Sequence, residues 1–345
     1  MFKAERIAVL AERKLGVLTS KTAACMVRYQ PHRVICIIDS TRSGQSVEQV
    51  LGFGGDIPVV GSLDEALALQ PDTLLMGIAP RGGALPDSWR KTVLDSIDNG
   101  LNIISGLHTL LSEDPEIGPA AERKNVAIWD IRKPVFPTEI SRGLLRNKSG
   151  YVLLTVGSDC RTGKMTVAYE LARGLNARGK KAEFVPTGQT GILLAGWGVA
   201  IDRIPGDFMA RVMEDLTLEG LSRAPVAIVE GQGSVVHPGY SGVALAMLHG
   251  SCPDGLILCH EPGREEIEGY GKVIPPLSQL IHLYEEAAAP VFASKVVAVA
   301  LNTYQLSEEK AREAARAVSA ETGLHATDVI RWGPEDLCEI VEGLL

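Results

Sequence analysis

The chain has 345 residues, of which 46% are hydrophobic and 22% are charged, and its formal net charge is -8 at pH 7. This composition predicts about two globular domains and excludes nucleic acid as an expected partner, because no basic surplus is present to displace phosphate counterions. The beginning of the chain lacks the apolar core of a signal peptide, and no apolar stretch reaches the roughly eighteen residues of a membrane span, so we expect a cytoplasmic protein with no membrane partner.

The first part of the chain alternates short apolar runs with helical patterns. We expect strands at residues 6–11, 33–38, 57–60, 73–78 and 101–104. Helices are expected at about residues 19–29, 44–51, 62–70 and 87–99. This alternation predicts a parallel sheet with helices on its faces, as in a Rossmann-like domain. Asp39 ends the second strand, where such folds often bind a ribose, but residues 11–19 lack the G-x-G-x-x-G turn of dinucleotide-binding proteins.

A glycine- and proline-rich loop at residues 77–86 follows the fourth expected strand, at the sheet edge where open α/β folds bind ligands. Arg81 in this loop could bind a substrate carboxylate, and an ordinary surface loop is the alternative. Residues 112–150 interrupt the pattern with prolines and mixed charges, and residues 135–138 are expected to form an extended linker. We place the domain boundary near residue 145, which gives a Rossmann-like domain at 1–145 and a second domain at 146–345.

The most informative stretch is YVLLTVGSDCRTGKMTVAYELARGL, which covers residues 151–175. An apolar strand, a glycine-containing loop and a helix that begins at Lys164 have the architecture of a phosphate cradle. Gly157 and Gly163 permit backbone conformations that bring several N–H groups to one anion. The alternative is a glycine-rich turn without a ligand. The expected cofactor-binding residues are Gly157, Ser158, Asp159, Cys160, Arg161, Thr162, Gly163, Lys164, Met165 and Thr166.

This loop departs from the usual P-loop pattern G-x4-G-K-[ST] at two places. Five residues separate Gly157 from Gly163, and Met165 stands where a hydroxyl residue ordinarily binds Mg²⁺. A thioether cannot replace that hydroxyl because hard cations prefer oxygen ligands, whereas Thr166 can still bind a phosphate oxygen. We therefore expect a loop that holds a polyphosphate better than it hydrolyses one.

Six cysteines are scattered along the chain without a C-x-x-C pair, so no zinc site and no disulfide framework is expected, and we predict no metal ligands. Cys160 lies in the phosphate loop close to a helix start and to Lys164, which predicts a lowered thiol pKa. A nucleophilic role and a simple ligand-lining role are both open for this residue.

Further strands are expected at residues 181–185, 224–229, 255–259 and 296–301, with helices around residues 208–214, 307–322 and 335–345. Polar residues and one glycine follow the carboxyl ends of these strands, at the same sheet edge as the phosphate loop. In chain order they are Gln189, Thr190, Glu230, Gln232, Gly233, Ser234, His237, Tyr240, Arg264 and Asn302. Glu230 occupies a position where such folds place a metal ligand or a general base.

Two of the polar residues have a structural and a functional interpretation. Asp207 is either the N-cap of the helix that follows it or a charged group facing the ligand. Asn302 is either an amide that recognises a purine edge or a turn-forming residue.

Four segments, GSDCRTGKMT, PTGQTGILLAGWG, EGQGSVVHPGYSG and CHEPGR, together resemble one family, and the resemblance covers nearly the whole chain. That family was long known only as a domain of unknown function, with an N-terminal Rossmann-like domain and a C-terminal P-loop domain. It includes bacterial D-glutamate N-acetyltransferases. The P-loop half is also similar to dethiobiotin synthetase, whose E-G-A-G segment matches residues 230–233. The resemblance implies an α/β fold with these two domains.

The resemblance also implies transfer of the acetyl group of acetyl-coenzyme A to the amino group of an amino acid, with D-glutamate as the expected substrate. The phosphate loop, with Asn302, would anchor coenzyme A. The candidate catalytic residues are Glu230, His237 and Asp207. The candidate substrate-binding residues are Arg81, Gln189, Thr190, Gln232, Gly233, Ser234, Tyr240 and Arg264.

An ATP- and Mg²⁺-dependent synthetase or kinase of the dethiobiotin synthetase type, acting on a small carboxylate, is the alternative. In that enzyme Lys164 would bind ATP, and Glu230 or Asp159 would hold the metal ion. Met165 weighs against it. A third possibility is a regulatory nucleotide-binding protein without catalysis. That function would not account for the segment after Glu230. A homo-oligomer is expected by default.

Overall fold

The computed structural model describes residues 4–78, 80, 82–133 and 139–345. The chain forms two compact units, Met1–Lys133 and Pro134–Leu345. Each unit contains a six-stranded sheet in which every neighbouring pair of strands is parallel, and helices connect the strands. The predicted α/β class is therefore confirmed. Arg81 and the predicted linker at residues 135–138 lie outside the described residues.

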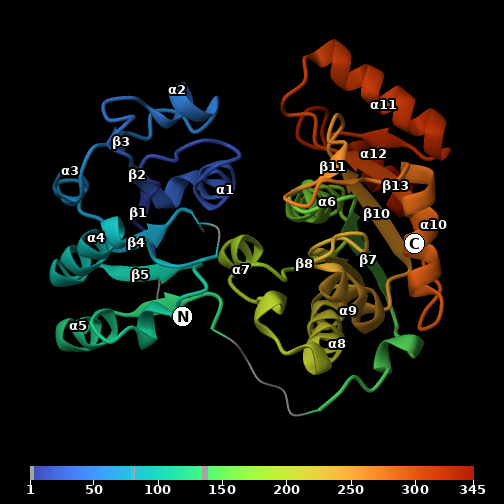
Figure 1. Cartoon of the computed structure of the whole chain (residues 1–345), viewed down its shortest axis with the longest axis horizontal. Coiled ribbons are helices and arrows are strands. Elements are labelled where there is room, and N and C mark those ends of the chain that lie inside the picture. The colour runs from blue at the N-terminus through green and yellow to red at the C-terminus, as the bar shows by residue number, and fades with distance from the viewer. Residues whose placement is uncertain (1–3, 79, 81, 134–138) are drawn as a thin grey trace. The chain divides into compact units, whose positions relative to one another are not determined.

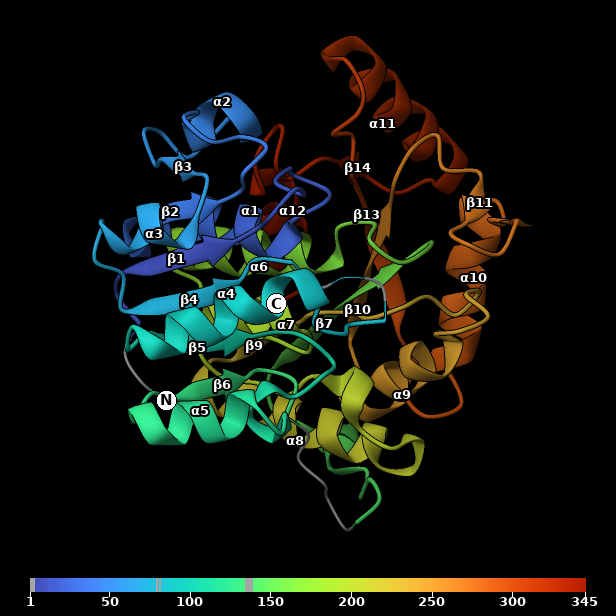
Figure 2. The same cartoon turned by 60° about the vertical axis from the view of Figure 1, so that its left-hand side comes forward.

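The sheet of the first unit has the strand order β3-β2-β1-β4-β5-β6. Its strands are β1 (Ile7–Leu10), β2 (Val34–Ile38), β3 (Val59–Val60), β4 (Thr73–Met76), β5 (Asn102–Ser105) and β6 (Ile128–Asp130). Its helices are α1 (Lys21–Tyr29), α2 (Val47–Leu51), α3 (Leu63–Leu67), α4 (Asp87–Asp98) and α5 (Ile117–Lys124), with 3-10 turns at Pro31–Arg33 and Leu111–Glu113. All five strands predicted here are confirmed. They are continuous apolar runs because helices cover both faces of the sheet, with α1 on one face and α4 and α5 on the other (Figure 1, Figure 2).

One helix and one strand occupy a region that was expected only to interrupt the pattern. Both α5 and β6 lie within residues 112–150, so this part of the prediction is wrong. Pro119 is tolerated because it lies in the first turn of α5, where a backbone N–H has no intrahelical acceptor. Oδ1 of Asp114 accepts the N–H groups of Glu116 and Ile117, at 3.0 and 3.1 Å, at the start of this helix. The strand β6 has only three residues, too few for a clear apolar run.

The sheet of the second unit has the strand order β14-β13-β10-β7-β9-β8. Its strands are β7 (Tyr151–Gly157), β8 (Ala182–Val185), β9 (Val226–Val229), β10 (Gly255–His260), β13 (Lys295–Leu301) and β14 (Ala326–Thr327). Its helices are α6 (Lys164–Ala177), α7 (Gln189–Ala195), α8 (Gly206–Arg223), α9 (Ser241–Ser251), α10 (Leu277–Ala288), α11 (Glu308–Thr322) and α12 (Glu335–Glu342). The short turns are 3-10 helices at Leu144–Asn147 and Ile201–Arg203, and a separate hairpin joins β11 (Glu266–Ile267) to β12 (Lys272–Val273).

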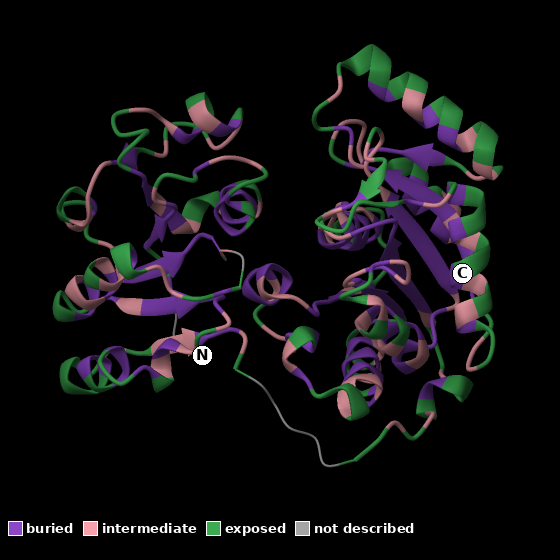
Figure 3. Cartoon of the chain, viewed as in Figure 1, coloured by how far each residue is buried: buried purple, intermediate pink, exposed green. Residues whose placement is uncertain are grey.

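The centre of this second sheet is buried on both faces, as the colouring of β7 and β10 in Figure 3 shows. Helices α8, α9 and α10 pack against one another in sequence, and α6 packs against α12. Because all strands run in the same direction, the carboxyl ends of β7, β9, β10 and β13 lie at one edge, which is where a ligand site is expected. Within the described residues, no helix is both long and apolar enough to cross a membrane.

Helix starts in the second unit give one correction and one confirmation. Pro205 occupies the N-cap of α8, and Asp207 lies exposed in its first turn, so of the two interpretations of Asp207 the N-cap is wrong, and its role as a charged group facing the ligand stays a prediction. The helix predicted at residues 307–322 is confirmed as α11. Ser307 is its N-cap, because the hydroxyl oxygen of Ser307 accepts the backbone N–H of Lys310 at 3.4 Å.

Candidate functional site

The loop between β7 and α6 bends around a buried lysine. Lys164 is 6% exposed, and its Nζ donates a hydrogen bond to the carbonyl oxygen of Asp159 at 2.7 Å. A Cβ atom added to Gly157 would lie 2.7 Å from Nζ and 2.9 Å from that carbonyl oxygen, so only glycine leaves room for the lysine here. Gly163 has a φ of 109°, a left-handed conformation that glycine adopts at low cost. The loop therefore has the buried lysine and the glycine conformation expected of a phosphate cradle, and anion binding by it stays a prediction.

The start of α6 points into the same loop. The first intrahelical bond runs from the N–H of Val167 to the carbonyl of Gly163, at 3.0 Å, so the N–H groups before it are directed out of the helix end. These groups and the helix dipole favour an anion at this point. Met165 is 2% exposed and packs in the interior. The position that usually supplies a hydroxyl to Mg²⁺ thus offers no ligand atom to the loop.

Asp159 is fully buried and is surrounded by donors. Its Oδ2 accepts Nη1 of Arg264 at 3.0 Å and the N–H of Glu268 at 2.9 Å, and its Oδ1 accepts the N–H of Cys160 at 2.7 Å. Burial raises the pKa of this carboxyl, but the two N–H groups and the guanidinium outweigh it and hold the pKa below its usual value. Arg264, which we expected to bind a substrate carboxylate, is ion-paired with both Asp159 and Glu261.

The hairpin of β11 and β12 lies against the phosphate loop, and the sequence did not predict it. Besides the bond from the N–H of Glu268 to Asp159, the side chain of Glu268 forms an ion pair with Arg161. Nη1 of Arg264, just before the hairpin, also donates to the carbonyl oxygen of Cys160 at 2.8 Å. Residues 264–268 therefore fasten the hairpin to the loop.

Cys160 has a half-buried thiol whose pKa is raised above the ordinary value. Burial is the main cause, and the positive charge of Lys164 offsets it only in part. The prediction of a lowered pKa is wrong, because the desolvation of the buried thiol raises its pKa by more than the helix start and the lysine lower it. This environment does not favour the thiolate that a nucleophilic cysteine requires.

His237 brings the segment after β9 to the phosphate loop. Its ring is 3% exposed, and its Nδ1 accepts the N–H of Gly239 at 3.1 Å, so the neutral ring carries its proton on Nε2. Ligand-type atoms of Asp159, Cys160 and His237 all lie within 4.8 Å of one another, the one such group in the described part of the chain. The carboxylate of Asp159 in this group is already ion-paired with Arg264 and accepts two N–H groups, so a cation here would have to displace these donors.

Glu230 holds the turn that follows β8. Its Oε2 accepts the N–H groups of Thr187 and Gly188 at 3.1 and 3.2 Å, and its Oε1 accepts the amide of Gln232 at 3.0 Å. Gly231 must be glycine, because a Cβ there would lie 1.6 Å from the carbonyl oxygen of Thr155. The end of β9 therefore passes directly against β7, which places Glu230 beside the loop.

Tyr284 and His260, which are not among the predicted site residues, contact the phosphate loop. The hydroxyl of Tyr284, on α10, donates to the carbonyl oxygen of Gly157 at 2.7 Å and accepts the N–H of Val235 at 3.2 Å. Burial raises the pKa of Tyr284 to about 12, so the phenol stays protonated. Ser158 Oγ lies 2.9 Å from Nδ1 of His260, whose pKa burial lowers to about 4. His260 is therefore neutral near pH 7 and adds no charge.

The other predicted site residues lie in α7 and in the segments that follow β9 and β13. Gln189 and Thr190 form the first turn of α7, after the turn that Glu230 holds. Ser234 is buried, with its Oγ 3.4 Å from the hydroxyl of Tyr284. Oδ1 of Asn302 accepts the N–H of Tyr304 at 3.4 Å, which is the geometry of a turn-forming residue.

Sequence comparison agrees with this architecture. A family model described as the P-loop domain of a domain of unknown function, DUF1611_C, matches residues 139–338, and the DUF1611_N Rossmann-like domain matches residues 40–134. The chain belongs to the DUF1611 family. The predicted N-terminal Rossmann-like and C-terminal P-loop domains are confirmed.

Relatives of this DUF1611 chain include two named proteins and a solved structure. The chain is similar to a "D-glutamate N-acetyltransferase" of Tritonibacter scottomollicae, at 38% identity over 79% of this chain and 81% of the relative. It is also similar to one of Pseudoalteromonas sp., at 35% identity over 80% and 83%. The crystal structure of a DUF1611 family protein from Anabaena variabilis is 35% identical, with a TM-score of 0.93 over 98% of this chain and 99% of the other. The predicted resemblance to a family that includes D-glutamate N-acetyltransferases is confirmed.

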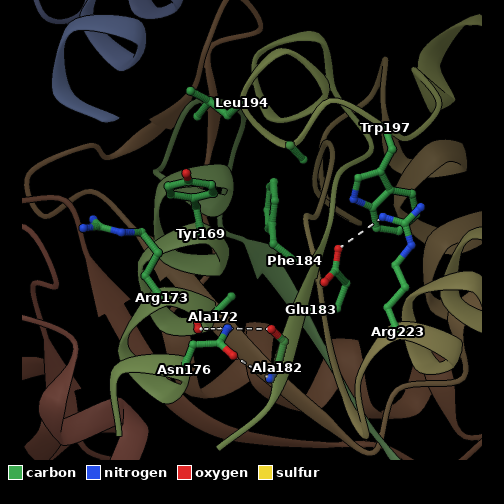
Figure 4. Close-up of a pocket in the computed structure, with 11 residues that line it drawn as sticks. Tyr169, Ala172, Arg173, Asn176, Ala182, Glu183, Phe184, Leu194, Trp197 and Arg223 are labelled. Atoms are coloured by element: carbon green, nitrogen blue, oxygen red, sulfur yellow. Dashed lines mark hydrogen bonds and ion pairs between the residues drawn. The ribbon is translucent and has the colours of Figure 1, made fainter. Parts of the chain in front are cut away.

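A cavity of about 240 Å³ in the second unit of this DUF1611 protein lies beside the edge strand β8 (Figure 4). Tyr169 and Phe184 meet edge to face in it, with ring centroids 5.2 Å apart, and the guanidinium of Arg223 stacks 3.9 Å from the ring of Trp197. Asn176 donates to the carbonyl oxygen of Ala182 at 2.6 Å and so occupies part of the strand edge.

Proposed function

We propose that this protein is an N-acetyltransferase that moves the acetyl group of acetyl-coenzyme A to the amino group of an amino acid, with D-glutamate as the substrate. The names of its relatives supply the reaction and the substrate. In the structure, one observation carries the proposal. The loop at residues 157–164 has the glycines, the lysine and the helix start that suit a diphosphate, while Met165 removes the hydroxyl that phosphate hydrolysis requires.

Two contacts weigh against the ATP- and Mg²⁺-dependent alternative. Asp159 and Glu230 were the candidate metal ligands of such an enzyme. Asp159 is already ion-paired with Arg264, and the carboxylate of Glu230 accepts three N–H donors. A Mg²⁺ ion would have to displace these donors, which stabilise the loop and the turn after β8. Coenzyme A could bind to the loop without a metal ion, so its binding would leave these contacts in place.

The length of coenzyme A separates the residues that hold the carrier from the groups that can act on its acetyl end. The arm between its diphosphate and its sulfur extends roughly 15 Å, given bonds of about 1.5 Å. With the diphosphate on the loop, residues that touch the loop hold the carrier, and groups that act on an extended acetyl end lie further away. We therefore assign His237, which lies against the loop, to positioning, and we assign Glu230 the same role because its carboxylate is bound to the turn at 187–188. Glu230 orients the turn at 187–188, and the Nε2–H of His237 donates toward the carrier.

The experiment is to incubate the protein with acetyl-coenzyme A and D-glutamate. Release of free thiol together with N-acetyl-D-glutamate, measured by mass spectrometry, is the expected result. L-glutamate and D-glutamine serve as matched amine substrates. Formation of ADP from ATP in the presence of a carboxylate, without thiol release from acetyl-coenzyme A, would instead support the synthetase or kinase.

The positioning role of Glu230 has its own test. Glu230→Gln is expected to lower kcat/KM because a neutral amide cannot accept the same three N–H donors. The pH dependence of kcat is expected to keep its shape, since a positioning residue does not titrate in the reaction. Loss of the acidic limb of that profile in the variant would show that Glu230 is the general base after all.

A further inference from the structure

Three tyrosines stand out by their exposure. Tyr240, Tyr270 and Tyr304 are 49%, 53% and 55% exposed, and they are the tyrosines with exposed side chains in the described part of the chain. Each lies in a segment that follows the carboxyl end of a strand, after β9, β10 and β13 respectively. Exposed aromatic rings commonly mark a binding surface, because covering their apolar area is favourable.

Two of these rings form a pair over a buried histidine. The ring of His237 contacts both Tyr240, at a centroid distance of 4.7 Å, and Tyr270, at 5.0 Å and 79° between the ring planes. The hydroxyl of Tyr270 reaches the chain at Gly239, where an added Cβ would meet it at 2.9 Å. We call Tyr240 and Tyr270 the tyrosine pair. Both of its rings contact the buried histidine, which fixes their position.

The tyrosine pair is adjacent to the phosphate loop. His237 offers a ring nitrogen within 4.8 Å of both Asp159 and Cys160. Tyr270 lies in the turn of the hairpin whose Glu268 N–H is bound to Asp159 at 2.9 Å. The tyrosine pair is therefore linked to the phosphate loop by contacts through His237 and through the hairpin.

We propose that the tyrosine pair is the binding surface for the pantetheine arm of the acyl carrier, an inference that rests on the proposed function. A ligand for this surface must join a diphosphate to a segment with apolar area. The pantetheine arm has this chemistry, because methyl and methylene groups separate its amides. The terminal phosphate of a nucleoside triphosphate offers no such area beyond the loop. The pair thus gives a structural reason for selecting coenzyme A.

The test compares two ligands that differ only in the arm. Calorimetry measures the Kd of coenzyme A and of adenosine 3′-phosphate 5′-diphosphate, which is coenzyme A without pantetheine. In Tyr240→Ala and in Tyr270→Ala the Kd of coenzyme A is expected to rise about tenfold, while the Kd of the armless nucleotide stays unchanged. Tyr240→Phe and Tyr270→Phe should bind coenzyme A like the wild type, since the ring surface carries the contact.

Tyr304→Ala is the matched control, because Tyr304 has a similar exposure and lies in the segment after β13. It is expected to leave the ratio of the two Kd values unchanged. The inference is overturned if both ligands weaken equally in the alanine variants of the tyrosine pair, or if neither ligand weakens. A wild-type protein that binds the armless nucleotide but no coenzyme A would refute the proposed function itself, and the inference with it.

Discussion

Replacing Arg264 by methionine tests the support of the phosphate loop most directly. The guanidinium contacts Oδ2 of Asp159 at 3.0 Å and the carbonyl oxygen of Cys160 at 2.8 Å. The side chain of Asp159 is 0% exposed and that of Arg264 is 19% exposed. Removing one partner of a buried ion pair costs about 3–5 kcal/mol. Because Asp159 keeps two N–H donors and Arg264 is partly exposed, we expect a loss of about 2–3 kcal/mol in the free energy of unfolding.

The pH dependence of this loss follows from the carboxyl group. The pKa of Asp159 is lowered in the folded protein, so its ionisation stabilises the fold above its unfolded pKa of about 3.9, and this contribution is lost as the pH falls through the folded pKa. In Arg264→Met, burial remains without the guanidinium, and the pKa of Asp159 rises. As the pH is lowered, the carboxylate of Asp159 is therefore protonated in the variant before it is protonated in the wild type. This protonation removes the unpaired buried charge of the variant. The difference between wild type and variant is therefore expected to shrink as the pH is lowered toward 4.

Urea unfolding at several pH values, followed by tryptophan fluorescence, measures this effect. Arg316→Met, an exposed arginine on α11, is the control and should change the free energy of unfolding by less than about 0.5 kcal/mol. In an Asp159→Asn background the cost of Arg264→Met should fall to about 1 kcal/mol, because no charge is left unpaired. A wild-type-like Arg264→Met at pH 7, or a loss that stays constant into the acidic range, would refute the reasoning.

Three further predictions concern single positions. Lys164→Ala should raise the Kd of coenzyme A roughly 10- to 100-fold in calorimetry with the fold retained, and an unchanged Kd would mean that the anion binds elsewhere. Gly231→Ala should abolish soluble expression or lower the melting temperature sharply, because the new Cβ would lie 1.6 Å from a backbone oxygen of Thr155, and a wild-type melting temperature would contradict this. Glu214 accepts the N–H groups at residues 142 and 144 at 2.8 and 2.6 Å. Burial raises its pKa, but these bonds and Arg211 outweigh it and lower the pKa, so Glu214→Gln should cost about 2 kcal/mol at pH 7 and progressively less as the pH falls through the acidic range, as urea unfolding will show.

Features that depend on neighbouring residues were predictable. The strand at residues 151–157, the glycines of the loop and the helix from Lys164 follow one another directly, and their local pattern is enough to predict a phosphate cradle. The parallel sheets were predictable for a similar reason, since buried strands are short apolar runs. The strand β6 escaped prediction because three residues, two half-exposed and one a buried aspartate, carry no such pattern.

Features that depend on distant residues were not predictable. Asp159 and Arg264 are 105 positions apart, and the hairpin that covers the loop was not expected. Arg264 was predicted to bind the substrate, but its pairing with Asp159 makes it a structural support of the loop. The error at Cys160 has the same origin, because its burial is created by parts of the chain that fold over it.

The sequence by itself determined the α/β class, the position of the phosphate loop and the loss of the Mg²⁺ hydroxyl at Met165, because these properties reside in local patterns of apolar, glycine and charged residues. Only the tertiary structure decided which charges are paired, which thiol is desolvated and which tyrosines flank the loop. Electrostatic energy and burial depend on distances in space, and residues far apart along the chain set those distances.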